Sequence, residues 1–242
     1  MKSGHRVALA QDARKTTIID IKTENTGADF MADNRRIISI QIGDSARQDL
    51  YYADASVGDR SLFQGVIRIR MLIAQGCVLA GYGLKGFEVP LLKRFLAVTI
   101  PEANTLDLRD MDGVKRLQQK TGRALLELEE VCSEYGIPAD HRRLMDEKAE
   151  PLKKRQEILA QANEAAKQLV AKGWNSDSSL KYALDTIVTG HAVLESYEEF
   201  VQKGGAGDTL FHKYAVGDVV CEHRLLQALQ QPSAPTSASP SV

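Results

Sequence analysis

Cysteine is scarce in this sequence, and its spacing excludes two classes of protein. The three cysteines, Cys77, Cys132 and Cys221, are far apart and form no CxxC pair. A structural zinc site or a disulfide scaffold needs paired or closely spaced cysteines, so neither is expected. Scattered thiols fit a reducing environment, and we predict a cytoplasmic protein.

Long hydrophobic runs and an excess of either charge are also missing. No apolar run could span a bilayer and the N-terminal residues hold no apolar signal region, so we expect no membrane association. Lys+Arg total 31 and Asp+Glu total 32, a formal net charge of −1. This balance neither requires nor excludes a nucleic-acid partner, and any basic surface must be local.

The sequence does contain enough apolar material for a sizeable core, since 43% of its 242 residues are hydrophobic. β-Branched and alternating patterns predict strands at residues 18–23, 36–43 and 49–53, and their close spacing favours an antiparallel arrangement. Residues 6–10 could form a further short strand.

The remainder of the chain reads mainly as helix. Apolar periodicity and Gly or Pro stops predict a helix at 61–75, a strand at 77–81, a loop entering a helix at 83–97, a strand at 105–108, and helices at 124–135, 139–172, 180–194 (interrupted at Gly190) and 209–230. We therefore expect one mixed α/β domain over residues 1–230, with a charged helical insertion at about 139–175 and a disordered tail at 231–242.

Three segments could carry chemistry. Asp20 ends a run of β-branched residues, a position from which a carboxylate can hold a divalent metal. Glu88 begins a helix after a glycine-rich loop that leaves room for a ligand. Tyr214 and Asp218 are four residues apart and share one face of the last helix, with Gly217 leaving space beside them.

Together these segments resemble the 3′–5′ exonucleases of the RNase H-like superfamily, of the DEDD type with a tyrosine. The resemblance spans about residues 14–230. Its motifs are Asp20-Ile21-Lys22, then Gly81-Tyr82-Gly83 with Phe87-Glu88 and Pro90-Leu91-Leu92, and finally Tyr214 and Asp218 followed by Leu225-Leu226. The family fold implied is an RNase H-like mixed sheet with antiparallel leading strands, flanking helices and, here, a helical insertion.

The resemblance implies two-metal hydrolysis of phosphodiester bonds at the 3′ end of DNA or RNA, with Mg²⁺ or Mn²⁺. In that scheme Asp20, Glu88 and Asp218 are metal ligands and Tyr214 orients the attacking water. Three basic residues beside the second motif could contact backbone phosphates or simply form a solvated helix face: Lys85, Lys93 and Arg94.

Three departures from the family pattern lie in this small site. Lys22 stands where the family has glutamate, Glu88 replaces an aspartate and Gly83 replaces an asparagine. Residues i and i+2 of a strand share a face, so Lys22 is expected beside Asp20, where its ammonium would repel a metal. The alternative is a Lys22 that extends to solvent at the sheet edge.

Two other places in the chain offer substitutes. Glu24 could replace the missing carboxylate if the strand bulged or turned directly after Asp20, and His191 with Glu195 is similar to the closing histidine–acid motif of the superfamily's histidine branch, with a glutamate as its acid. The sequence thus leaves two functions open. One is an exonuclease weakened by Lys22; the other is an inactive exonuclease-like module that binds nucleic acid or a protein partner, the latter through the charged helix at 139–172.

Overall fold

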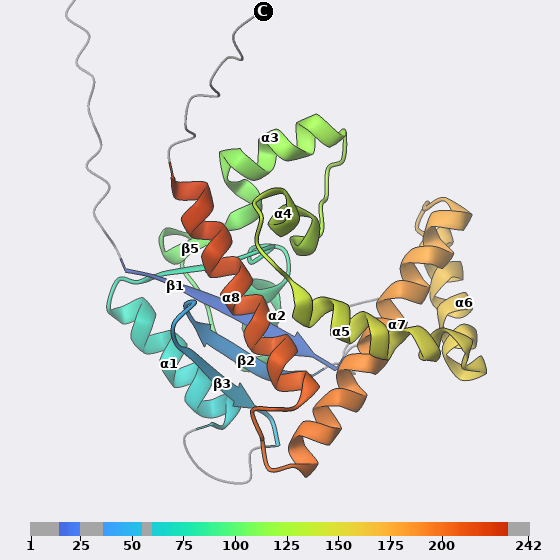
Figure 1. Cartoon of the computed structure of the whole chain (residues 1–242), viewed down its shortest axis with the longest axis horizontal. Helices are drawn as coiled ribbons and strands as arrows, with labels where there is room; N and C mark the ends of the chain where they lie inside the picture. Colours follow the sequence, from blue (N-terminus) through green and yellow to red (C-terminus); the bar gives the residue numbers. More distant parts are fainter. Residues whose placement is uncertain (1–14, 25–35, 55–59, 232–242) are drawn as a thin grey trace, which may run out of the picture.

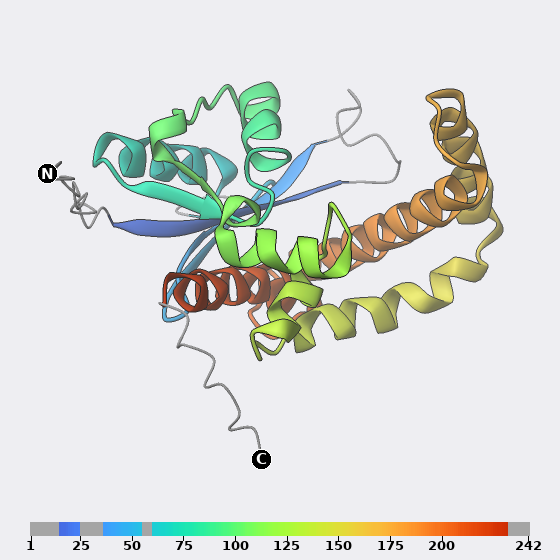
Figure 2. The ribbon, with the colours of Figure 1, turned by 90° about the horizontal axis from the view of Figure 1, so that it is seen from above.

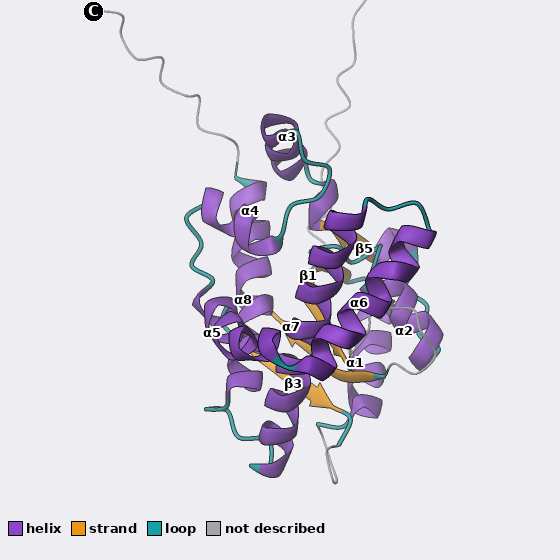
Figure 3. Cartoon of the chain, turned by 90° about the vertical axis from the view of Figure 1, so that its right-hand side faces the viewer, coloured by secondary structure: helices purple, strands orange, loops and turns teal. Residues whose placement is uncertain are grey.

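The computed structural model describes residues 15–24, 36–54 and 60–231, in which one mixed sheet carries helices on both faces (Figures 1 and 3). Its strands are β1 (Thr16–Thr23), β2 (Ile37–Gly43), β3 (Gln48–Tyr52), β4 (Val78–Gly81) and β5 (Thr105–Asp107). They lie in the order β3-β2-β1-β4-β5. β1, β2 and β3 pair antiparallel, as expected for the leading half, whereas β4 is parallel to β1 and to β5.

Eight α-helices accompany the sheet in the described residues. They are α1 (Leu62–Ala74), α2 (Glu88–Leu96), α3 (Asp112–Thr121), α4 (Leu128–Glu134), α5 (Asp140–Ala149), α6 (Gln156–Ala171), α7 (Ser176–Gln202) and α8 (Leu210–Gln230), with short 3-10 helices at Glu102–Asn104, Leu108–Asp110 and Glu150–Lys154. α1 and α2 cover one face of the sheet, while α8 crosses the other (Figures 1 and 3).

β1 is buried on both faces, and its alternation decides which side chains reach α8. Ile19 and Ile21 belong to the core under α1 and α2, while Ile18 belongs to the core under α8. By the two-residue period of a strand, Asp20 and Lys22 lie on the same side as Ile18.

Asp20 is not at the end of its strand, because β1 continues through Lys22 to Thr23, close to the strand predicted at 18–23, and its register shifts only between those two residues. The parallel pairing of β1 with β4 nevertheless reaches only as far as Ile18 opposite Ala80. Asp20 therefore lies just beyond the carboxyl end of β4, an edge where cavities form in such sheets.

Several helix boundaries differ from the predictions. The predicted single helix at 139–172 is divided into α5 and α6 by the 3-10 helix Glu150–Lys154, where Pro151 removes a backbone donor and clashes with a continuing helix. The interruption predicted at Gly190 is wrong, since α7 is continuous over 27 residues. The helix predicted at 124–135 is the shorter α4, and α3 was not predicted.

α6 and the first half of α7 form a helical arm that projects away from the sheet (Figure 2). The second half of α7 returns to the core, where Tyr197 and Phe200 pack against Phe211 of α8. The strand suggested at 6–10 and the tail predicted from residue 232 lie outside the described residues. Of the helices in the part of the chain described, none is both long and apolar enough to cross a bilayer.

Candidate functional site

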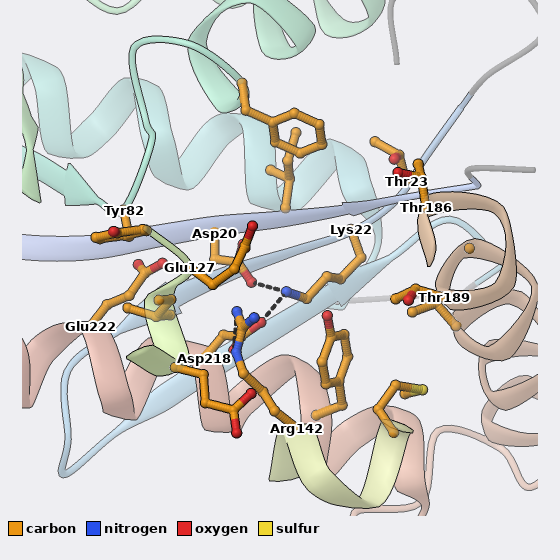
Figure 4. A pocket seen from close by; sticks show the side chains of 18 of the residues that line it. Asp20, Lys22, Thr23, Tyr82, Glu127, Arg142, Thr186, Thr189, Asp218 and Glu222 are labelled. Atoms are coloured by element: carbon orange, nitrogen blue, oxygen red, sulfur yellow. Dashed lines mark hydrogen bonds and ion pairs between the residues drawn. The ribbon is translucent and has the colours of Figure 1, made fainter. Parts of the chain in front are cut away.

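An ion pair on β1 is the centre of the candidate site (Figure 4). Lys22 Nζ lies 2.8 Å from Asp20 Oδ2, and it also donates to Asp218 Oδ2 on α8. The ammonium sits 4.6 Å from the centroid of the Tyr214 ring, a cation–π contact. Lys22 therefore lines the site and does not extend to solvent, and it joins two of the carboxylates that the family pattern assigns to metal.

α5 supplies a second set of partners to Asp218. His141 Nε2 lies 2.9 Å from Asp218 Oδ1, and Arg142 Nε donates to the same oxygen at 2.8 Å. Gly217 permits this approach, because a Cβ there would lie 2.3 Å from His141 Cγ. Both oxygens of the buried Asp218 are thus held by protein cations or by an imidazole.

A glutamine on β2 completes the surroundings of Asp20. In the amide orientation that satisfies every neighbour, Gln41 Nε2 donates to Asp20 Oδ2 at 3.2 Å and to the Asp20 carbonyl at 2.9 Å. The amide oxygen then accepts from the Ser39 hydroxyl at 2.6 Å. Gln41 is directly opposite Asp20 in the antiparallel register, so the sheet itself fixes this contact.

Burial and neighbouring charges oppose each other at this centre. Burial lowers the pKa of Lys22, but the carboxylates of Asp20 and Asp218 outweigh it and hold that pKa well above its ordinary value. Burial raises the pKa of Asp218, but Arg142 and Lys22 outweigh it, and the carboxyl stays ionised. For Asp20 the effect of burial exceeds that of the Lys22 charge, and the pKa of the carboxyl is raised. At most two negative charges here face two cations.

Two further buried carboxyl groups each have an oxygen without a hydrogen-bond partner among the described residues. They belong to Glu88 and Glu222, which are 4% and 3% exposed, and the oxygen is Oε2 in each. Burial, followed by the charge of Asp20, raises the pKa of Glu88 to about 8. Burial and the charges of Asp20, Glu88 and Asp218 hold the pKa of Glu222 well above its ordinary value. At neutral pH the Glu88 carboxyl is therefore mainly protonated.

The glycine-rich loop that precedes Glu88 is fastened by Asp107 at the end of β5. Its carboxylate accepts from the backbone N–H of Gly83 at 2.9 Å and of Lys85 at 3.0 Å. Gly83 has a φ of +91°, and a Cβ there would lie 3.0 Å from the guanidinium carbon of Arg109, which stacks 4.7 Å from the Tyr82 ring centroid. Glycine is required at position 83 for both reasons.

The carboxyl groups of this centre, with Lys22 and Arg142, line one cavity of about 580 Å³. Of the predicted site residues, it brings together Asp20, Lys22, Glu88, Tyr214 and Asp218. The first half of α7 forms its far wall and α4 and α5 its rim, and the residues they contribute include Tyr182, Asp185, Thr186, Thr189, Glu127, Glu129, Arg142 and Asp146.

The three predicted phosphate contacts do not line this cavity. Lys85 is paired with Asp110 at 2.6 Å, and Lys93 and Arg94 are exposed on α2. The role of these three residues in binding phosphate stays a prediction, and their positions do not support it.

The two substitutes also lie elsewhere. Glu24 forms an ion pair with Arg36 at 2.6 Å, because β1 does not bulge directly after Asp20. His191 Nε2 lies 2.9 Å from Gln161 Oε1 on the arm, and Glu195 pairs with Arg155 at 2.6 Å.

Four residues of the candidate site were not predicted from the sequence. Glu222 follows Asp218 by four residues, so the helical repeat that paired Tyr214 with Asp218 could have found it. Gln41, His141 and Arg142 carry no local signal, because strand register and the packing of α5 on α8 bring them in.

The residues do not suit a pair of divalent ions as they are arranged. The Lys22 ammonium already occupies the space between Asp20 and Asp218. Over residues 15–24, 36–54 and 60–231, no three His, Cys, Asp or Glu side chains are grouped so that they could hold a metal. What the arrangement offers chemically is a charge-balanced centre with carboxyl groups around it.

Comparison with known proteins adds no identity to this geometry: no family model, no curated protein and no solved structure matches the chain.

Proposed function

We propose that this chain is an RNase H-like module of the 3′–5′ exonuclease type in which Lys22 replaces the metals, and that it acts by binding and not by cutting. The observation that carries the proposal is the Lys22 ammonium, 2.8 Å from Asp20 Oδ2 and hydrogen-bonded to Asp218. The mixed sheet with antiparallel leading strands and flanking helices supports the fold part of the proposal.

Electrostatics explains why Lys22 opposes a metal. Two unit charges 4 Å apart interact by about 4 kcal/mol at an intermediate dielectric constant, and a divalent ion doubles this repulsion. The same ammonium and Arg142 already neutralise Asp20 and Asp218. A metal would therefore have to break existing ion pairs, and it would enter a site with no net negative charge to attract it.

A weakened exonuclease is the second candidate. It is favoured by the convergence of Asp20, Glu88, Asp218 and Tyr214 on one cavity, since the resemblance assigns a site role to each of these four positions. On this candidate the substrate is a DNA or RNA 3′ end, the ions are Mg²⁺ or Mn²⁺, and Lys22 has to move before they bind.

A nuclease assay separates the two candidates. End-labelled single-stranded DNA and RNA are incubated with Mg²⁺ or Mn²⁺ and with the natural protein, Lys22→Glu or Asp20→Ala. We expect no 3′ trimming by the natural protein. Trimming by the natural protein that Asp20→Ala abolishes would overturn the binding proposal and establish the exonuclease.

Metal-dependent stability gives a second readout that needs no substrate. Lys22→Glu and the milder Lys22→Gln should gain stability with Mn²⁺, by about 2.7 kcal/mol when the ion is a hundredfold above its dissociation constant. The natural protein should show no such gain. An equal gain in the natural protein would mean that Lys22 does not exclude the ion.

A further inference from the structure

One face of α7 extends the cavity from the ion-paired centre toward the arm. Tyr182, Asp185, Thr186, Thr189 and Gly190 follow each other at intervals of three, one, three and one residues and all line it. These intervals place them on a single helical face. The cavity is thus a groove that begins at Tyr182 and ends at the buried carboxyl groups beside β1.

Acidic residues outnumber basic residues in the lining of the groove. Its acidic lining residues are Asp20, Glu88, Glu127, Glu129, Asp146, Asp185, Asp218 and Glu222, against the cationic Lys22, Arg109 and Arg142. Three of these acids, Glu129, Asp146 and Asp185, form no ion pair with any described residue. A phosphate backbone would meet these carboxylates without a metal between them, so nucleic acid is disfavoured and a cationic occupant is favoured.

The two orphaned oxygens show where a cationic donor would end. Glu88 Oε2 and Glu222 Oε2 are buried, accept no hydrogen bond from a described residue and line the groove. Figure 4 shows the Glu222 side chain rising from α8 toward β1. A buried acceptor without a donor costs free energy that an incoming donor would restore.

At the other end of the groove, Tyr182 lines the cavity and packs against Trp174, which lies outside its lining. The rings of Trp174 and Tyr182 are 5.3 Å apart, and the two residues are 47% and 41% exposed. Exposed aromatic faces attract guanidinium groups through cation–π contact and stacking. The groove therefore has an aromatic entrance, an acidic wall and an acceptor-lined end.

We propose that this groove receives an arginine side chain from a basic peptide segment of a protein partner. The proposal rests on the proposed function, because the groove must be free of metal. Arginine fits better than lysine because its planar fork donates to two acceptors at once, and two separate carboxyl groups await a donor at the end of the groove.

The single tryptophan of the chain, Trp174, provides a direct reporter of binding. A peptide of alternating glycine and arginine is titrated into the full protein while tryptophan fluorescence is followed. The matched peptides carry citrulline, which has nearly the same shape without the charge, or lysine. We expect a saturable change with the arginine peptide, weaker binding of the lysine peptide by about tenfold, and none with citrulline.

Neutral, shape-conserving variants locate the site. Asp185→Asn should weaken arginine-peptide binding by about tenfold, since it removes one charge-assisted acceptor. Glu222→Gln should weaken it less, since its amide keeps an acceptor oxygen in place of the buried carboxyl. Glu164→Gln, an exposed acid of α6 outside the groove, should bind as the natural protein does. Asp185 is exposed, so its variant keeps the test valid even if the buried Glu222→Gln unfolds.

Equal binding of the arginine and citrulline peptides would overturn the proposal, as would equal weakening by Glu164→Gln. Displacement of the arginine peptide by a single-stranded oligonucleotide would assign the groove to nucleic acid instead. None of these results bears on whether the protein cleaves nucleic acid in the presence of a metal, so the proposed function would still stand. Displacement of the peptide by Mn²⁺ together with 3′ trimming would instead defeat both this inference and the proposed function.

Discussion

Glu88 is a carboxyl group placed where its ionised form is disfavoured, and this couples its protonation to folding. Its pKa rises from 4.5 to about 8, first because of burial and then because Asp20 is nearby. Between these pH values the folded state holds a proton that the unfolded state has released. The stability contribution is therefore complete below pH 4.5 and is lost as the pH rises through about 8.

Glu88→Gln should remove this dependence. The amide keeps the shape of the protonated acid, so the variant should lose less stability between pH 5 and pH 8 than the natural protein does. The difference in slope should be at most about 1.4 kcal/mol per pH unit. Urea unfolding across this range measures it, with Glu164→Gln as the exposed control. Parallel pH profiles for Glu88→Gln and the natural protein would show that Glu88 is ionised in the folded state.

At the scale of elements, the approach of α5 to α8 depends on a missing side chain. Gly217 lies inside α8, where alanine would ordinarily gain about 1 kcal/mol of helix propensity. Here a Cβ would lie 2.3 Å from His141 Cγ, whose Nε2 contacts Asp218. The close packing of the two helices therefore outweighs propensity at this position.

Gly217→Ala should consequently destabilise the protein, by about 1–3 kcal/mol as overpacked cores do. In a His141→Ala background the same change should stabilise by up to about 1 kcal/mol, because the clash is gone and only propensity remains. Chemical denaturation of the four proteins of this cycle measures both values. The same sign in both backgrounds would show that His141 is not the group that Gly217 accommodates.

Elements dominated by local periodicity were predictable from sequence, and those decided by tertiary context were not. The leading strands, α1, β4 and α8 follow from β-branched runs and apolar spacing. The continuity of α7 through Gly190 does not, because a glycine weakens a helix locally and only the packing of its buried face, including Ile187 and Val193, preserves it here. The polar α3 has few apolar positions to reveal it.

The same division holds within the candidate site. Asp20, Glu88, Tyr214 and Asp218 were found because each stands in a local pattern, and the strand period placed Lys22 beside Asp20. The Arg142 contact was not foreseeable, because it joins residues 76 positions apart through the packing of α5 on α8.

At the scale of the whole molecule, the arm is held by fewer buried residues than the sheet. α6 packs on α7 and on the 3-10 helix Glu150–Lys154, and its buried residues are few: Ile158, Ala162 and Ala166. α7 is better held at its other end, where the Tyr197 hydroxyl donates to Asp54 Oδ2 at 2.8 Å. The arm should therefore open locally at a lower free energy than β1 and α8.

Ala162→Asp tests this inequality, because it places an unpaired carboxylate between α6 and α7 at a site with no exposed surface. We expect hydrogen exchange over α6 and the first half of α7 to accelerate about a hundredfold, while protection of β1 and α8 is retained. Ala160→Asp, the same substitution at an exposed position of α6, should leave exchange unchanged. Loss of protection throughout the sheet in Ala162→Asp would show that arm and sheet unfold as one unit. If they open separately, the same variant should also lose arginine-peptide binding, because the wall that carries Tyr182 and Asp185 belongs to the opened arm.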